Sequence, residues 1–153
     1  MKTAKLPYKI ALRVRRSKAR VFIPSDFSDL SGYDQILRVL RKMVRGNQLV
    51  RIGQGIYAKA KTRSDGTVAP VGFIGVLAGE ALKKYGVKTG NSSALNAYNA
   101  NVSTQVPNGR VIAVSKRVRR KIGFNGYGVG FEMMNKRYKS RWFNRENIKG
   151  ISE

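Results

Sequence analysis

The clearest pattern in the chain is an alternation of apolar and basic positions at helical spacing between residues 33 and 46. With about 100° per residue, the apolar side chains fall within an arc of roughly 120°; they are Ile36, Leu37, Leu40, Met43 and Val44. The opposite arc holds Arg38, Arg41, Lys42 and Arg45. Gly46-Asn47 is a typical end for a helix. The pattern predicts an amphipathic helix with a buried apolar face and an exposed basic face.

The residues on either side of this helix predict further short elements. Upstream we expect a helix over residues 6–18, a short strand at 21–23 and, after Pro24, a short helix over 26–30. Downstream, two strand-like runs at 49–52 and 56–59 flank Gly53-Gln54-Gly55, which predicts a hairpin with a three-residue loop. A basic helix followed directly by a hairpin predicts a winged helix-turn-helix over residues 1–61.

The second half of the chain has weaker signals. Residues 61–70 are expected to be a linker or exposed loop, with a turn at Asp65-Gly66. Apolar spacing predicts a helix from Ile74 that ends at Gly86, and Ser92 is a plausible cap for a short helix. We expect a strand at 110–115 and a hairpin around residues 125–128.

These elements predict an α+β protein. Its parts would be the winged helix-turn-helix, a small α+β domain with an antiparallel sheet over residues 70–134, and a basic C-terminal tail over residues 135–153.

The charge of the chain narrows the class of partner. The 153 residues include 31 Lys and Arg but 8 Asp and Glu, a net charge of +23. Such self-repulsion is best tolerated when the partner is a polyanion. The net charge is +12 over residues 1–61, +7 over 62–134 and +4 over 135–153. Nucleic acid is therefore the expected partner, and the first domain its expected binding site.

Other function classes are disfavoured by the composition. The chain has no Cys and no His, which excludes zinc sites, thiol catalysis and Ser-His catalysis. We expect no metal and no cofactor. No apolar run is long enough for a signal peptide or a membrane span, so we expect a cytoplasmic, nucleoid-associated protein without a membrane partner.

Two sets of residues are candidates for contact with double-stranded DNA. Arginine pairs with guanine and glutamine with adenine, and the N-terminal end of a recognition helix usually reaches deepest into the major groove. The candidates for base contacts are Ser31, Tyr33, Gln35 and Arg38. The candidates for the DNA backbone and the hairpin are Arg13, Arg15, Arg16, Lys18, Arg20, Arg41, Lys42, Arg45, Arg51, Gln54 and Lys59. The alternative is that the basic arc is only a solvated helix face.

A second basic cluster lies in the second domain. It comprises Lys116, Arg117, Arg119, Arg120 and Lys121. Alternation with Val118 predicts that they occupy a strand. A second nucleic-acid contact and an acidic protein partner are both consistent with this cluster.

The chain also resembles the AbiEi-type antitoxin family, transcriptional regulators of toxin–antitoxin operons. The resemblance is good over about residues 19–60 and loose over 70–134. It is carried by Phe22-x-Pro24-x-Asp26-Phe27, Leu37-x-x-Leu40, Arg51-Ile52-Gly53-x-Gly55-Ile56-Tyr57 and, after residues 94–100, Ser103-Thr104-Gln105-Val106-Pro107. It implies DNA binding by a winged helix at operator repeats upstream of the protein's own gene. It also implies a second domain that opposes a nucleotidyltransferase toxin.

We therefore expect a sequence-specific DNA-binding repressor, in the role of an antitoxin and autoregulator, and not an enzyme. Two alternatives remain. One is a small basic ribonuclease toxin that uses Glu80, Lys83, Lys84 and Glu132. The other is a structural RNA-binding protein, for which the charge is equally suitable.

Overall fold

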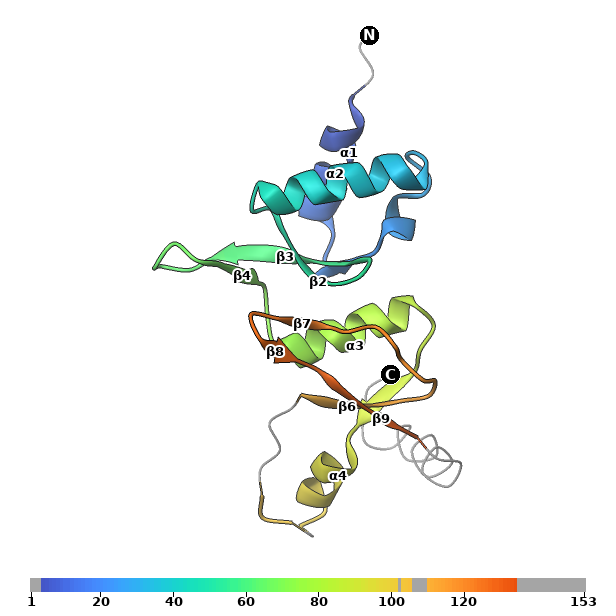
Figure 1. Ribbon diagram of the computed structural model, residues 1–153, viewed down its shortest axis with the longest axis vertical. Coiled ribbons are helices and arrows are strands. Elements are labelled where there is room, and N and C mark those ends of the chain that lie inside the picture. Colours follow the sequence, from blue (N-terminus) through green and yellow to red (C-terminus); the bar gives the residue numbers. More distant parts are fainter. Residues whose placement is uncertain (1–3, 102, 106–109, 135–153) are drawn as a thin grey trace. The chain divides into compact units, whose positions relative to one another are not determined.

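The computed structural model describes residues 4–101, 103–105 and 110–134, and the chain divides into two units between Phe73 and Ile74. Both units contain helices and strands (Figure 1), so the predicted α+β class is confirmed. The expected basic tail at 135–153 lies outside the described residues.

Two α-helices and one short 3-10 helix belong to the first unit. They are α1 (Leu6–Arg16), η1 (Pro24–Phe27) and α2 (Tyr33–Arg45). The predicted helix at 33–46 is thus confirmed. The short helix expected at 26–30 begins earlier, at Pro24, and is a 3-10 helix. At its start, Asp26 Oδ2 accepts a hydrogen bond of 2.9 Å from the Ile23 amide.

The strands of the first unit are all antiparallel. They are β1 (Val21–Phe22), β2 (Leu49–Gly53), β3 (Ile56–Thr62) and β4 (Val68–Pro70). Three of them lie in the order β1-β3-β2, and β4 pairs with the distal end of β3. The predicted hairpin of β2 and β3 is confirmed, but its loop is shorter than expected. Gly53 pairs with Ile56 across a bulge, which leaves Gln54-Gly55 as the loop, with φ of 67° at Gly55.

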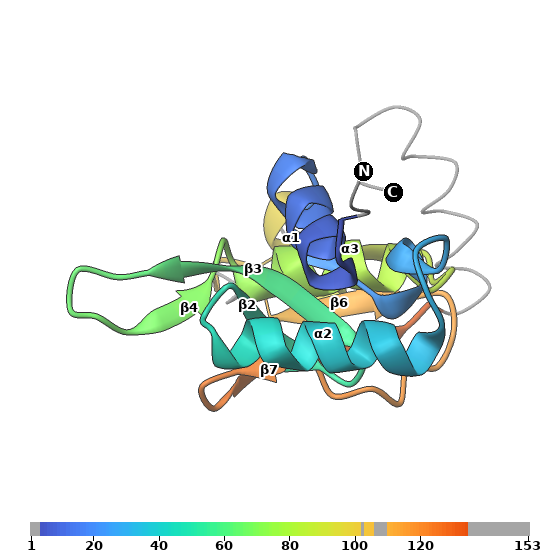
Figure 2. The same cartoon turned by 90° about the horizontal axis from the view of Figure 1, so that it is seen from above.

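The segment at 61–70 is not the linker that the sequence predicted. Lys61 pairs with Ala69 and Thr62 with Val68, so β3 and β4 form a second hairpin. The Asp65-Gly66 turn lies at its tip, where Asp65 accepts hydrogen bonds from the Thr67 amide and hydroxyl. Figure 2 shows this hairpin extending away from α1 and α2.

The core of the first unit lies between the two helices and the sheet. Ile10 and Val14 contribute from α1, and Phe22, Leu49 and Tyr57 from the strands. The side chains from α2 are Ile36, Val39, Leu40 and Met43, while Leu37 and Val44 are half-buried. The buried face of α2 is therefore rotated toward Val39, which the sequence pattern had not included.

In its described residues, the second unit combines two helices with two small sheets. Its elements are α3 (Ile74–Lys84), β5 (Thr89–Asn91), α4 (Ser93–Asn99), β6 (Val111–Val114), β7 (Gly123–Phe124), β8 (Tyr127–Gly128) and β9 (Gly130–Met133). The buried side of α3 contacts β5, β6 and β7. Ser92 caps α4 as predicted, because its Oγ accepts a hydrogen bond of 3.1 Å from the Leu95 amide.

The sheet of this unit differs from the expected antiparallel one. Its strand order is β5-β6-β9, and β9 runs parallel to β6. Parallel strands need a connection of about a dozen residues or more, and residues 115–129 supply it. Within that connection β7 and β8 pair around Asn125-Gly126, both at positive φ, which is the two-residue hairpin turn that Asn-Gly favours.

Candidate nucleic-acid interface

The basic side chains of α2 all lie on its exposed face. Ile36, Leu40 and Met43 are buried on the opposite side. The exposed cations are Arg38, Arg41, Lys42 and Arg45, and Asp34 in the first turn is the acidic residue of this helix. Figure 2 shows α2 as a straight helix that runs alongside β2. The fold therefore presents a row of positive charges about two to three turns long on a rigid element.

The four predicted base-contact residues do not share one face. Gln35 and Arg38 are about 60° apart around the helix axis, and both are exposed. Tyr33 is also exposed, at 64%, but it lies about 140° from Arg38, on the side of the apolar arc. Ser31 precedes the helix and is half-buried. The structure thus brings together Gln35 and Arg38 and leaves Ser31 and Tyr33 apart from them.

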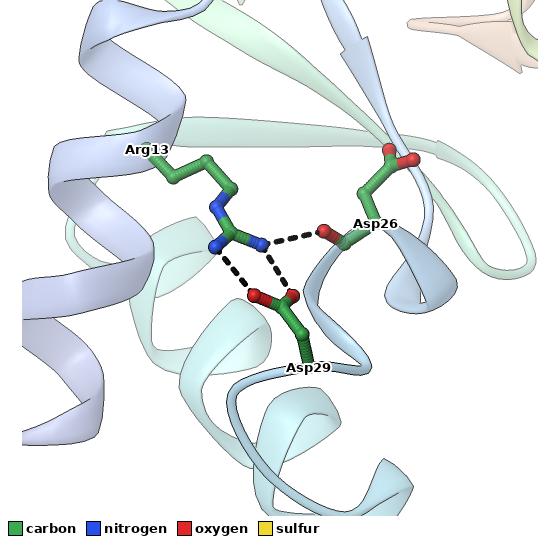
Figure 3. A network of polar contacts seen from close by, with 3 residues as sticks. All are labelled: Arg13, Asp26 and Asp29. Carbon is green, nitrogen blue, oxygen red and sulfur yellow. Dashed lines mark hydrogen bonds and ion pairs between the residues drawn. The ribbon is translucent and has the colours of Figure 1, made fainter.

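Arg13, a predicted DNA-backbone contact, has a structural role that the sequence did not predict. Its Nη1 and Nη2 donate to Asp29 Oδ1 and Oδ2 at 2.6 and 2.8 Å, and Nη1 also donates to the Asp26 carbonyl oxygen at 2.9 Å (Figure 3). These bonds link α1 to the segment that leads into α2. The hydrogen bonds to Arg13 lower the pKa of Asp29, and those to Asp29 raise the pKa of Arg13.

Lys59, another predicted DNA-backbone contact, also has a structural bond within the first unit. It is half-buried on β3, and its Nζ donates to the Ser17 carbonyl oxygen at 2.5 Å. Ser17 follows the last residue of α1, where helix carbonyls lack partners and a cation is favourable. The side chain therefore joins β3 to the end of α1.

The other predicted cations of α1 and its following segment are arranged less uniformly. Arg15, Arg16 and Lys18 are exposed, whereas Arg20 is half-buried. On the β2–β3 hairpin, Arg51 is exposed and its Nε donates to the Gly53 carbonyl oxygen at 3.3 Å. Gln54 is exposed at the tip. These residues remain candidates for phosphate contacts.

The β3–β4 hairpin adds two exposed cations, Lys61 and Arg63, that the sequence analysis did not select. The signal was present: an Asp-Gly turn lies between two short runs that contain Thr and Val. Hydrogen bonds from Thr67 lower the pKa of Asp65 at the tip, so this carboxylate stays ionised there.

A shallow groove of about 410 Å³ lies between α1, the end of α2 and β3. Its walls are formed by Ala11, Val14, Arg15, Met43, Gln48, Lys59 and Ala60. These residues include no carboxylate and no hydroxyl, so the groove has neither a pair of acidic groups nor a nucleophile for catalysis.

In the second unit, the cluster at 116–121 is not on a strand, which corrects that prediction. The residues between β6 and β7 are irregular, and Lys116, Arg117, Arg119 and Lys121 are exposed. Arg120 is half-buried, with its guanidinium 4.0 Å from the centroid of the Tyr85 ring. The pairing of β5 and β9 with β6 reaches Val114, so residues 116–121 lie beyond the paired part of the sheet.

The two acidic residues that the ribonuclease alternative would use, Glu132 and Glu80, have different surroundings. Both oxygens of Glu132 accept a hydrogen bond from the Ser93 amide, at 3.1 and 3.3 Å, and so stabilise the start of α4. Glu80 is half-buried on α3. Among the described residues, no three His, Cys, Asp or Glu side chains are grouped to hold a metal ion. In the same part of the chain no helix is both long and apolar enough to cross a membrane.

Comparisons with known proteins gave no relatives. No family model matches this chain, and no match was found among curated proteins or solved structures.

Proposed function

We propose that the protein binds double-stranded DNA sequence-specifically through the exposed face of α2 and the β2–β3 hairpin, and that its first unit is a winged helix-turn-helix. The proposal rests mainly on the exposed face of α2. It presents Gln35, Arg38, Arg41, Lys42 and Arg45 on a regular helix, with its apolar side buried against the sheet. A side chain that is not needed for packing is available to a ligand.

The order of the helices and strands in the first unit supports the same interpretation. Helix α1, strand β1, η1, helix α2 and the β2–β3 hairpin follow one another, with β1 and β2 on either side of β3. A winged helix-turn-helix has this order. In it the helix before the hairpin enters the major groove, and the hairpin lies beside it. An α-helix of 13 residues is about 20 Å long, and the major groove is wide enough to admit it.

The expected roles divide along α2. Arg38, with two parallel donors, is suited to the O6 and N7 acceptors of guanine, and Gln35 to adenine. Arg41, Lys42 and Arg45 lie toward the C-terminal end and are suited to phosphates. Arg15, Arg16 and Arg51 are further candidates for phosphates. Phosphate contacts supply most of the affinity and a steep dependence on salt.

We also propose that the protein acts as a transcriptional repressor of its own operon, in the role of an antitoxin. This part rests on the resemblance of residues 19–60 to AbiEi-type antitoxins. A repressor needs only to occupy an operator, which a DNA-binding face can do without catalysis.

The test is selection of duplexes from a randomised pool with the full chain, followed by competition with random duplex and with structured RNA at fixed salt. We expect a recurrent motif, bound at least about 10³-fold more tightly than random duplex. Equal affinity for every duplex, or a preference for structured RNA, contradicts the proposal.

A further inference from the structure

The second unit brings two separate stretches of the chain together as one basic surface. The Ser115 amide donates to the Lys88 carbonyl oxygen at 2.9 Å, and the Lys88 amide donates to Ser115 Oγ at 3.0 Å. Arg120 stacks on Tyr85 at 4.0 Å. We call the resulting set the second basic surface; it consists of Lys88, Lys116, Arg117, Arg119, Arg120 and Lys121.

We propose that the second basic surface binds the sugar–phosphate backbone of duplex DNA beside the sequence read by α2, without reading bases. This inference rests on the proposed function. It assigns the second unit a part in DNA binding that is independent of sequence.

The charges of this surface need a polyanion. Lys116, Arg117, Arg119 and Lys121 are four exposed cations within six consecutive residues, and like charges within about 10 Å repel one another at ordinary salt. The second unit has two carboxylates between residues 74 and 134, Glu80 and Glu132. Glu132 accepts a hydrogen bond from the Ser93 amide. A row of phosphates would relieve the repulsion and release counterions.

The chemistry of the surface favours phosphates over a protein partner. Protein interfaces need large apolar or aromatic anchors that become buried. Tyr85 is half-buried under Arg120, and Ile122, which ends the segment, is buried at 2% exposure. Within residues 115–122 no large apolar side chain is exposed. This segment has no aromatic ring on which a single-stranded base could stack; the exposed ring of Tyr127 lies outside it, with the Arg110 guanidinium 4.4 Å from its centroid.

The surface is held in place before any ligand arrives. Val114 precedes it and Ile122 follows it, and both are buried. The next residue, Gly123, cannot be replaced without movement, because a Cβ there would be 2.5 Å from the Tyr127 carbonyl oxygen. The segment is thus anchored at both ends and by Arg120 in the middle. Little conformational entropy is then lost on binding.

The salt dependence of binding by the full chain tests the proposal. In the variant Arg117→Ala/Arg119→Ala/Lys121→Ala, the slope of log affinity against log salt should become shallower by about 0.9 for each phosphate that the variant no longer neutralises, up to about 2.7. The affinity ratio between the selected duplex and a scrambled one should not change. Arg120 is left in place because its stacking on Tyr85 shapes the segment.

The matched control keeps the charges, as Arg117→Lys/Arg119→Lys/Lys121→Arg. It should retain the wild-type slope, and a shallower slope in this control would show that the segment acts through its shape, which overturns the proposal. If the alanine variant keeps the wild-type slope, the proposal for the second basic surface is overturned, but the proposed function is not. The same holds if the variant loses affinity only for structured RNA. If the wild-type chain binds no duplex at all, the proposed function fails as well.

Discussion

The basic face of α2 and the second basic surface differ more in the regularity of their backbone than in their charge. On α2 the cations sit at fixed angles on a straight helix, next to Gln35, and their spacing is maintained by a buried apolar face. Between β6 and β7 the cations sit on an irregular segment that is held by its ends and by the stacking of Arg120 on Tyr85. A regular row of donors can follow the edges of bases in a groove. An irregular one supplies charge alone, so we assign sequence reading to the first region and phosphate binding to the second.

The largest effects are expected when the cations of each region are replaced by alanine in turn. The variant Arg38→Ala/Arg41→Ala/Lys42→Ala/Arg45→Ala should bind the selected duplex roughly 100-fold or more weakly, and with little sequence preference, because it lacks the donors for a base and for several phosphates. Alanine favours helix, so α2 should persist. Fluorescence anisotropy titrations measure the change in affinity.

The matched variant Lys116→Ala/Arg117→Ala/Arg119→Ala/Lys121→Ala removes the same number of charges from the second unit. It should weaken binding to selected and scrambled duplexes alike. Loss of sequence preference in this variant and not in the α2 variant would reverse the roles that we assign.

The two faces of α2 should separate stability from binding. Leu40 is fully buried, so Leu40→Ala should lower the free energy of unfolding by about 2–5 kcal/mol. The exposed neighbour Arg41→Ala should change it by no more than about 0.5 kcal/mol while weakening DNA binding. Urea denaturation gives the first quantity and titration the second. Equal destabilisation by both variants would mean that the basic face also packs within the protein.

A single substitution should distinguish base reading from phosphate binding. Arg38→Ala should cost about 1–3 kcal/mol against the selected duplex and less against a scrambled one, so that the affinity ratio falls. Arg117→Ala should weaken both equally. An unchanged ratio for Arg38→Ala would remove this residue from the set that contacts bases.

The smallest effect is expected for the ion pair between Arg13 and Asp29, which links α1 to the segment before α2. The pKa of Asp29 is lowered in the folded protein, from an ordinary value of about 3.9. The stability that Asp29 contributes is therefore present above about pH 3.9 and is lost as the pH falls through the lowered folded value. The effect is small, because Arg13 and Asp29 are 38% and 63% exposed.

Thermal unfolding of the wild type and Asp29→Asn measures this contribution. The wild type should have the higher midpoint near pH 6, and the difference should shrink at strongly acid pH. A difference that stays constant down to acid pH would show that the carboxylate charge is not its source.

The sequence was most informative where periodicity and burial coincide. The helix at 33–46 was predicted within a residue at its end, because apolar residues recur at every third or fourth position and basic residues lie on the opposite side. The β2–β3 hairpin, the cap at Ser92 and the turn at Gly86, which has a φ of 76° after the end of α3, also followed from local residue types. Local rules were sufficient there because the stabilising groups are close in the chain.

The parts that could not be predicted depend on residues distant in the chain. The hydrogen bonds of Arg13 could not be predicted, because nothing in its neighbourhood shows that Asp29 accepts them. The bond of Lys59 could not be predicted for the same reason, since its partner is the Ser17 carbonyl oxygen. The parallel pairing of β9 with β6 likewise depends on the course of the chain and not on local pattern.

The central claim is that α2 lies in the groove of a specific duplex, and one position-specific measurement tests it. The chain has no cysteine, so Arg45→Cys and Arg117→Cys each offer a single site for a tethered iron chelate that cleaves nearby DNA. The chelate at position 45 should cut within a few base pairs of the selected motif, and the one at position 117 only in flanking DNA. Cleavage spread evenly along the duplex from position 45, or confined to the motif from position 117, would contradict the account.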